Sequence, residues 1–146
     1  VITSNISSIT SLNVSNKNIT NLTGIEGFIA LTTLICSNNQ LTNIDISQNI
    51  ALDYFDCNLN QLTSLDVTQN TALTLLACRS NQITSLDVSN NSLLEYFSCH
   101  TNLLTNLDVS QNPALVRLWC YNNQLTSLNV KNGANTNILN SDFNAT

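Results

Sequence analysis

The 146-residue chain has few charged residues, and basic residues are the scarcest among them. Charged residues make up 9% of it, against about a quarter of an ordinary globular chain. Four Lys and Arg stand against nine Asp and Glu, so the net charge is −5 and no basic patch is available for nucleic acid. Apolar stretches are no longer than four residues, which excludes a membrane-spanning segment in this sequence.

Several residue types that catalytic sites depend on are also rare. With three glycines in all, the chain has no glycine-rich phosphate-binding loop, and it has no metal-binding motif. His100 is the single histidine, so a Ser–His–Asp arrangement has no second candidate. Alternation along a strand sends Cys99 and His100 to opposite sides of the backbone, which argues against a Cys–His dyad. The sequence therefore predicts neither an enzyme nor a cofactor.

Polar uncharged residues replace the missing charges, and the cysteines reveal an internal repeat. The chain contains 26 Asn, 17 Thr and 16 Ser. A constant period of 20–50 residues indicates a solenoid or array of stacked units. Each unit reads L-x-x-[LF]-x-C-x-x-N-x-[LI]-T-x-[LI]-[DN]-[IV] and then five further residues, and an imperfect 22-residue unit starts at Ile9. The period is 21 residues at every step, from Cys36 through Cys57, Cys78 and Cys99 to Cys120.

This pattern resembles the leucine-rich repeat family, whose signature is L-x-x-L-x-L-x-x-[NC]-x-L, with cysteine here in the third leucine position. The resemblance covers about residues 9–134 in six consecutive units. Two nested half-repeats in each unit resemble the short bacterial subclass. The unit from Ile9 is similar to the internalin-type repeat, which implies a short 3₁₀ turn near Ile25–Phe28. The sequences of the repeats most resemble those of secreted or cell-surface proteins of Gram-negative bacteria. This resemblance implies the same location for this chain.

The repeat also predicts the architecture on physical grounds. Apolar residues alternate with polar or variable ones in both halves of each unit, as in half-buried strands. The expected fold is mainly β: a right-handed solenoid of about six coils, with parallel sheets on two sides and almost no helix. We expect a single domain over residues 1–146. Residues 1–30 would hold a cap remnant and the 22-residue repeat, residues 31–134 the five regular repeats, and residues 135–146 the start of a truncated coil or cap.

Two columns of equivalent residues are expected to stabilise this solenoid. Five thiols cannot all pair, and parallel Cβ vectors on stacked strands do not suit a disulfide. The cysteines are therefore interpreted as small buried hydrophobes, with a metal or redox role as the weaker alternative. The second column is expected to bond the backbone groups that the turn leaves unpaired, in its own coil and the next. It consists of Asn39, Asn60, Asn81, Asn102 and Asn123.

A ladder of acidic residues occupies the second half-repeat. Stacked carboxylates about 5 Å apart repel one another by roughly 0.8 kcal/mol per pair in water. Neighbouring Ser and Thr donors or a bound cation must offset this repulsion. Hydrogen bonding to the local backbone and hydroxyls is the favoured interpretation, and Ca²⁺ bound along the ladder is the alternative. The ladder consists of Asp45, Asp66, Asp87 and Asp108.

The outward positions of the first half-repeat differ in every unit, and we call these fifteen positions the variable face. They are residues 33, 35 and 37 and their equivalents at 21-residue steps. All three tyrosines, the tryptophan, the histidine and both arginines lie among them. Side chains two residues apart on a strand share one face, and aromatic residues and arginine dominate binding hot spots. The candidate binding residues are Tyr54, Asp56, Arg79, Tyr96, His100, Arg117, Trp119 and Tyr121.

The sequence thus favours a recognition or adhesion module that binds a protein partner through the variable face, across the coils from Leu94 to Asn123. The family resemblance implies the same surface. One alternative is a carbohydrate-binding module whose Tyr and Trp side chains stack on sugar rings while Asp56 and Asn58 bond hydroxyls. A structural spacer is another, in which the aromatic residues only pack across coils and Asp56 pairs with Arg79.

Overall fold

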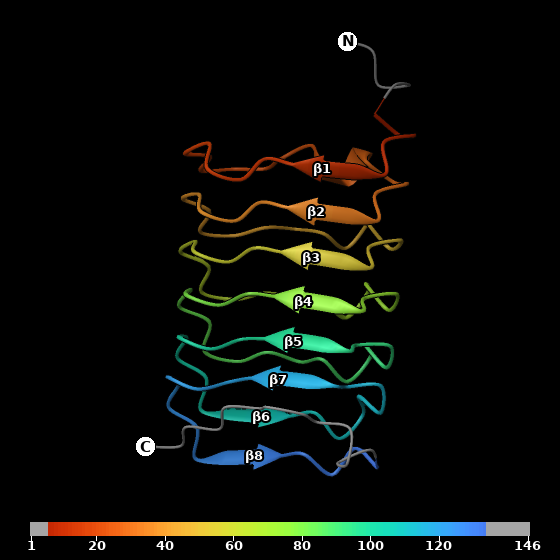
Figure 1. Ribbon diagram of the computed structural model, residues 1–146. Helices are drawn as coiled ribbons and strands as arrows, with labels where there is room; N and C mark the ends of the chain where they lie inside the picture. The colour runs from red at the N-terminus through yellow and green to blue at the C-terminus, as the bar shows by residue number, and fades with distance from the viewer. Residues whose placement is uncertain (1–5, 134–146) are drawn as a thin grey trace.

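The structure is a computed structural model that describes residues 6–133 of the chain. This part of the chain winds as a solenoid whose strands stack one above another (Figure 1). The predicted mainly β solenoid with almost no helix is confirmed: the described residues contain one 3₁₀ turn, η2 (Ile25–Gly27). This turn lies where the internalin resemblance placed it. No helix among residues 6–133 is long and apolar enough to cross a membrane. The expectations for residues 135–146 lie outside the described residues.

One strand from each coil contributes to the main sheet, and all its neighbouring strands are parallel. In the regular repeats each residue pairs with the residue 21 positions later, as Phe55 does with Leu76. Because the register equals the repeat length, each column of equivalent residues forms one row across the sheet. The strands, in order, are β1 (Ser11–Asn13), β2 (Thr33–Ile35), β3 (Tyr54–Asp56), β4 (Leu75–Ala77), β5 (Tyr96–Ser98) and β7 (Arg117–Trp119).

The core lies between the two long sides of the coils. The central residue of each strand from β2 to β7 in the main sheet is fully buried, and its two neighbours on the same strand point outward. The five cysteines are at most 1% exposed and unpaired, so they pack as the sequence predicted. Burial raises the pKa of the Cys36 and Cys78 thiols to about 12, with the Asp56 charge adding to the effect on Cys36.

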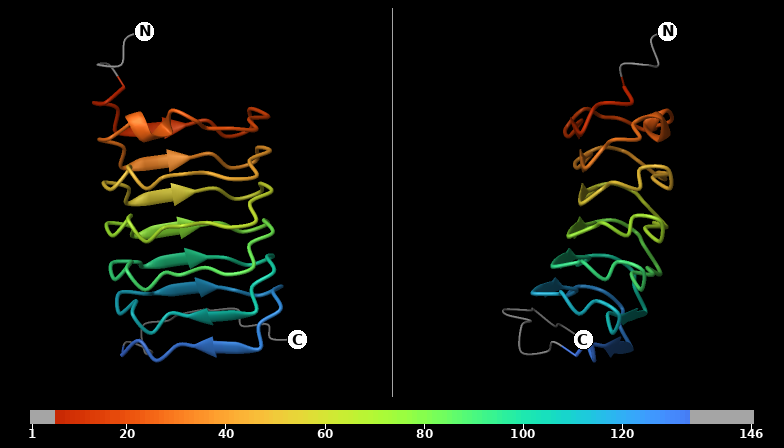
Figure 2. Two further views of the ribbon diagram at one scale, coloured as in Figure 1. Left: turned by 180° about the vertical axis from the view of Figure 1, so that it is seen from behind. Right: turned by 90° about the vertical axis from the view of Figure 1, so that its right-hand side faces the viewer.

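The second sheet has fewer strands than the sequence predicted. It contains two strands, β6 (Asn106–Asp108) and β8 (Ser127–Asn129), paired in parallel on the other long side of the coils (Figure 2). The equivalent segments of the coils before β6 follow the same path without regular strand pairing. In paired and unpaired coils alike, backbone N–H groups such as those of Ser47 and Ser110 donate to the aspartate side chains of their own turns.

The predicted asparagine column forms hydrogen bonds in every regular coil, and those of the three middle coils are buried. Asn81 accepts from the backbone N–H of Leu62 at 3.0 Å and donates to the carbonyls of Cys57 and Cys78 at 3.1 and 3.0 Å. Its contacts reach back to the preceding coil, rather than forward as the sequence analysis expected. Each such residue therefore joins two consecutive coils at the turn that follows the first strand.

A second asparagine column was missed by the sequence analysis. Its members are fully buried, and each side-chain amide donates to two backbone carbonyls. Asn70 Nδ2, for example, donates to the carbonyls of Ile46 and Asn49 at 3.0 and 2.9 Å. The side-chain oxygens of this column have no hydrogen-bond partner. The signal was an unbroken asparagine at 21-residue steps: Asn49, Asn70, Asn91 and Asn112.

Candidate functional site

The eight candidate residues lie on the outer side of the main sheet or, for Arg79, His100 and Tyr121, two residues beyond the end of a strand. Arg117 is exposed, and the other seven are half-buried. They come from four neighbouring strands, β3, β4, β5 and β7, whose parallel register sets them in three adjacent rows. The sequence therefore brings together all the residues it singled out, because a single repeat length controls both their spacing and the sheet register.

Four of them, Tyr54, Asp56, Tyr96 and Trp119, line a shallow hollow of about 170 Å³, which we call the aromatic hollow. It exists because Ala77 and Ser98 are small residues that lie between Asp56 and Trp119 in one row of the sheet. The sequence analysis missed these two residues, although their small size among bulky equivalents was readable from the repeat. The remaining lining residues are Asn58, Leu75 and Leu76.

Two ring contacts organise the rest of the variable face. The rings of His100 and Tyr121 stack with centroids 4.3 Å apart and planes inclined by 10°. Burial lowers the pKa of His100, and the positive charge of Arg79 lowers it further. The guanidinium carbon of Arg117 lies 5.9 Å from the centroid of the Tyr96 ring, within cation–π distance.

Asp56 is the one acidic residue that lines the aromatic hollow. Its Oδ1 accepts the backbone N–H of Asn58 at 3.0 Å. The pairing with Arg79 that the spacer alternative proposed is absent, and Asp56 forms no ion pair with any residue of the range 6–133. The hollow therefore combines apolar surface, three aromatic side chains and a carboxylate that forms no ion pair within residues 6–133.

The structure separates Cys99 from His100, as the sequence predicted. Cys99 is fully buried, and burial raises its pKa well above the ordinary thiol value. His100 faces outward, where its Nδ1 lies 3.1 Å from the hydroxyl of Thr101. A nucleophilic thiolate needs a lowered pKa and access to an adjacent base, and this cysteine has neither.

The aspartate ladder follows the opposite side of the coils and is exposed. Asp45 Oδ1 accepts the backbone N–H of Ser47 at 2.9 Å, and Asp66 Oδ1 accepts the hydroxyl and N–H of Thr68 at 2.6 and 2.9 Å. These hydrogen bonds lower the pKa of both carboxyls: the Ser47 N–H is the main cause for Asp45, and the Thr68 hydroxyl for Asp66. Local donors thus stabilise the charged ladder.

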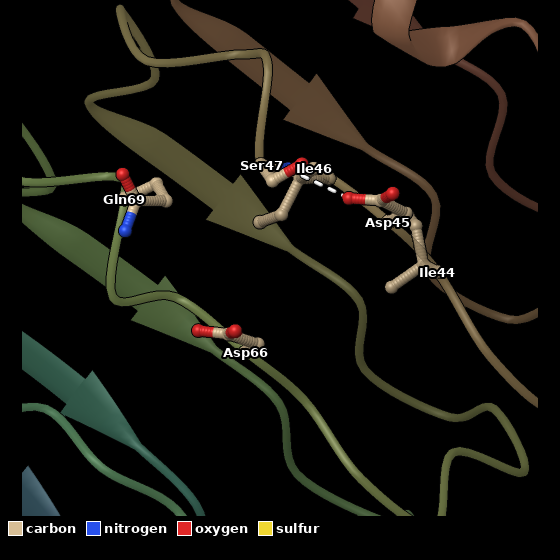
Figure 3. A pocket seen from close by; sticks show the side chains of 6 residues that line it. All are labelled: Ile44, Asp45, Ile46, Ser47, Asp66 and Gln69. Carbon is tan, nitrogen blue, oxygen red and sulfur yellow. Dashed lines mark hydrogen bonds between the residues drawn. The ribbon is translucent and has the colours of Figure 1, made fainter.

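Shallow depressions accompany the ladder. Figure 3 shows one of about 360 Å³, where Asp45 turns toward Ser47 and where Asp66 comes from the next coil. A similar depression lies beside Asp87 and Asp108. Among residues 6–133, no three His, Cys, Asp or Glu side chains are grouped to hold a metal ion. The depressions recur because the sequence recurs, so they do not distinguish one coil from another.

Comparison with known proteins identifies the same kind of solenoid. No protein-family model matches the chain. A solved structure of the functional domain of internalin J from Listeria monocytogenes, which includes a cysteine ladder, is 45% identical over 96% of this chain, with a TM-score of 0.91. Curated internalin J from a serotype 4b strain of that species is 46% identical over 44 residues, which are 30% of this chain. The chain spans 31% of the solved internalin J chain and 5% of the curated protein.

More distant structures share the fold. An internalin, InlF, of Listeria monocytogenes has a TM-score of 0.82 at 19% identity, covering all of this chain and 52% of its own. A leucine-rich repeat protein of Leptospira interrogans has a TM-score of 0.74 at 22% identity, covering 94% of this chain and 43% of its own. The relative with 45% identity comes from Listeria monocytogenes, so the Gram-negative source that the sequence implied is not supported. The 21-residue period, the buried cysteine column and these similarities together make the chain a leucine-rich repeat protein.

Proposed function

We propose that this chain is a non-enzymatic recognition or adhesion module that binds a protein partner through its variable face, on the surface of a bacterium or secreted from it. One observation carries the proposal: the main sheet gathers all the tyrosines, the tryptophan and both arginines on one face. The opposite side repeats the same few polar residues in coil after coil. A chain that needed only to stack its coils would have no physical reason for this asymmetry.

The arrangement suits a binding surface energetically. Aromatic side chains supply large contact areas while losing few rotatable bonds on binding. The ring stack of His100 on Tyr121 and the contact of Arg117 with Tyr96 hold several of these side chains in place before a partner arrives. Such preorganisation lowers the entropy cost of association. Both contacts lie in the coils from Leu94 to Asn123, where we expect the partner to dock.

A carbohydrate-binding function is the alternative that one feature of the structure favours. The aromatic hollow presents Tyr54, Tyr96 and Trp119 beside the polar groups of Asp56 and Asn58. A sugar ring stacks on an aromatic side chain while its hydroxyls donate to a carboxylate. A glycan array separates the two functions, because it presents sugars without any protein surface.

The proposal is tested by panning a displayed library of extracellular protein domains against the immobilised chain. Each enriched binder is then measured against Trp119→Ala and against Asp87→Ala, a control on the opposite side of the coils. We expect Trp119→Ala to weaken binding by about 2 kcal/mol or more, as loss of a central aromatic anchor does, and Asp87→Ala to leave it unchanged. Binders that lose affinity with Asp87→Ala and keep it with Trp119→Ala would show that the face is wrong.

A further inference from the structure

The aromatic hollow contains a carboxylate that forms no ion pair with any cationic side chain of residues 6–133. Asp56 is half-buried, and Oδ1 accepts a hydrogen bond from the Asn58 N–H. Both arginines of the chain lie on the same face, yet neither forms an ion pair with it. Arg117 lies over Tyr96, and Arg79 acts on His100. The negative charge at this end of the hollow is therefore available to a ligand.

The rest of the hollow restricts what that ligand can be. Leu75 and Ala77 provide apolar surface in it, and three aromatic side chains line it as well. An occupant needs an apolar portion to cover this surface. An occupant without a hydrogen-bond donor would, however, remove water from the Asp56 carboxylate and leave a charge buried without a partner, which costs several kcal/mol.

We propose that the aromatic hollow receives the basic side chain of a lysine or arginine from the protein partner. This inference rests on the proposed function and names the chemistry of one contact within it. The hydrocarbon stem of a basic side chain covers the apolar surface of the hollow while its charged head reaches Asp56. The aromatic side chains attract the same cation through their π faces. Tyr96 already receives a guanidinium in this way from Arg117.

Charge complementarity supports a cationic occupant over a neutral one. Asp56 is the one charged residue that lines the hollow, so a cationic group bound there meets a charge of opposite sign. A neutral sugar can donate hydroxyl hydrogen bonds to Asp56 but leaves its charge uncompensated. The two occupants also differ in salt dependence, because binding of a cation weakens as ionic strength rises and binding of a neutral sugar does not.

The test uses capped pentapeptides with glycines on both sides of a central residue. The central residue is lysine, arginine or norleucine, and norleucine keeps the alkyl stem of lysine without its charge. Trp119 is the single tryptophan and lines the hollow, so its fluorescence reports binding directly. Methyl β-glucoside serves as the neutral sugar probe. We expect the lysine or the arginine peptide to bind about tenfold tighter than the norleucine peptide, a difference of about 1.4 kcal/mol.

A matched pair of variants assigns this preference to one carboxylate. Asp56→Asn removes the charge but keeps an oxygen that can accept the Asn58 N–H, so the local turn is retained. We expect it to reduce the preference for the basic peptides to within about twofold of norleucine. Asp53→Asn removes the same charge from an exposed neighbour outside the hollow and should keep the preference. Circular dichroism spectra of both variants check that they fold.

Three results would overturn the inference: no fluorescence change with either basic peptide, equal binding of the norleucine peptide, or a preference that survives Asp56→Asn. Tighter binding of methyl β-glucoside than of both basic peptides would also overturn it and favour a sugar ligand. A partner whose binding is lost with Trp119→Ala, found together with any of these results, leaves the proposed function standing while this inference fails. The proposed function itself would fail if partner binding were unaffected by substitutions anywhere on the variable face.

Discussion

Both long sides of each coil have alternating buried and outward residues, but their outward side chains make different contacts. On the aspartate side, the outward residues repeat from coil to coil and their polar atoms bond to their own turns, as Asp66 does with Thr68. On the variable face, the outward residues change in every coil, and several contact one another rather than the backbone, as His100 does with Tyr121. A repeated backbone needs only its buried columns, so its outward positions are free for either use.

This comparison explains why the residues of the variable face can differ between coils with little loss of folding stability. The cysteine and leucine columns fill the core, and the asparagine columns satisfy buried backbone groups between coils. Substitutions in the buried columns should therefore lower stability, whereas substitutions on the variable face should change binding. The predictions below test this division, beginning with the largest expected effect.

The first prediction concerns the two asparagine columns. Asn81→Ala leaves the buried N–H of Leu62 without a partner, which costs about 1–3 kcal/mol. It also removes one of the two amide donors to each of the carbonyls of Cys57 and Cys78, at about 1 kcal/mol or less per lost hydrogen bond, because each carbonyl keeps a second asparagine amide. We expect a loss of about 3 kcal/mol in the free energy of unfolding, measured by urea denaturation. The matched variant Asn91→Ala breaks two hydrogen bonds and removes a side-chain oxygen that had no partner. It should cost less, and an equal or larger loss would contradict this account.

The second prediction concerns backbone strain at the corner after β3. Leu59 has a φ of 54°, in the left-handed region that non-glycine residues rarely adopt, and it is 43% exposed. Asparagine tolerates this conformation, and it occupies the equivalent positions Asn38 and Asn122, also at positive φ. Leu59→Asn should therefore raise the free energy of unfolding by about 1 kcal/mol.

Leu103→Gln is the control for this prediction. It also replaces an exposed leucine with the polar residue found at the equivalent positions of the other regular repeats, such as Gln82, but outside the positive-φ column. Its unfolding midpoint in urea should hardly change. If both variants shift the midpoint by the same amount, exposure of leucine rather than backbone strain is the cause.

The third prediction concerns the pH dependence of the aspartate ladder. The pKa of each ladder carboxyl is lowered from 3.8 in the folded chain, so the unfolded chain binds protons first as the pH falls. The stabilisation is fully present above the unfolded pKa and is lost as the pH falls through the folded pKa. Asp66→Asn should flatten the fall in unfolding free energy below pH 4, measured by urea titrations at successive pH values. An unchanged slope would show that the local hydrogen bonds do not favour the charged form.

Much of the fold was predictable because one number, the repeat length, sets the register of the main sheet. The cysteine column and the 3₁₀ turn at Ile25–Gly27 followed from pattern and family resemblance. The two-stranded second sheet was not predictable, because the repeat carries the same alternation in coils whose segments pair as strands and in coils whose segments do not. The buried column that includes Asn91 was readable, but its positions were treated as variable.

The candidate site was predicted in part for a similar reason. Alternation placed Trp119 and the other seven candidates on one face, since each lies in an outward position of a strand or just beyond it. The hollow was not foreseen because it arises from two small side chains, those of Ala77 and Ser98, that lie between larger neighbours. The sequence also does not show that Arg79 forms no ion pair with Asp56, because that depends on side-chain conformations.

The most direct test of the division between the two sides is to erase one end of the variable face and measure folding and binding together. The triple variant Arg117→Thr, Trp119→Ile and Tyr121→Ser gives this coil the variable-face residues of the first regular coil, Thr33, Ile35 and Ser37. It removes one ring stack and one cation–π contact, so the free energy of unfolding should fall by no more than about 2 kcal/mol. Binding of a partner selected against the unmodified chain should be lost. An unfolded variant, or a folded one that binds the partner with unchanged affinity, would contradict the account.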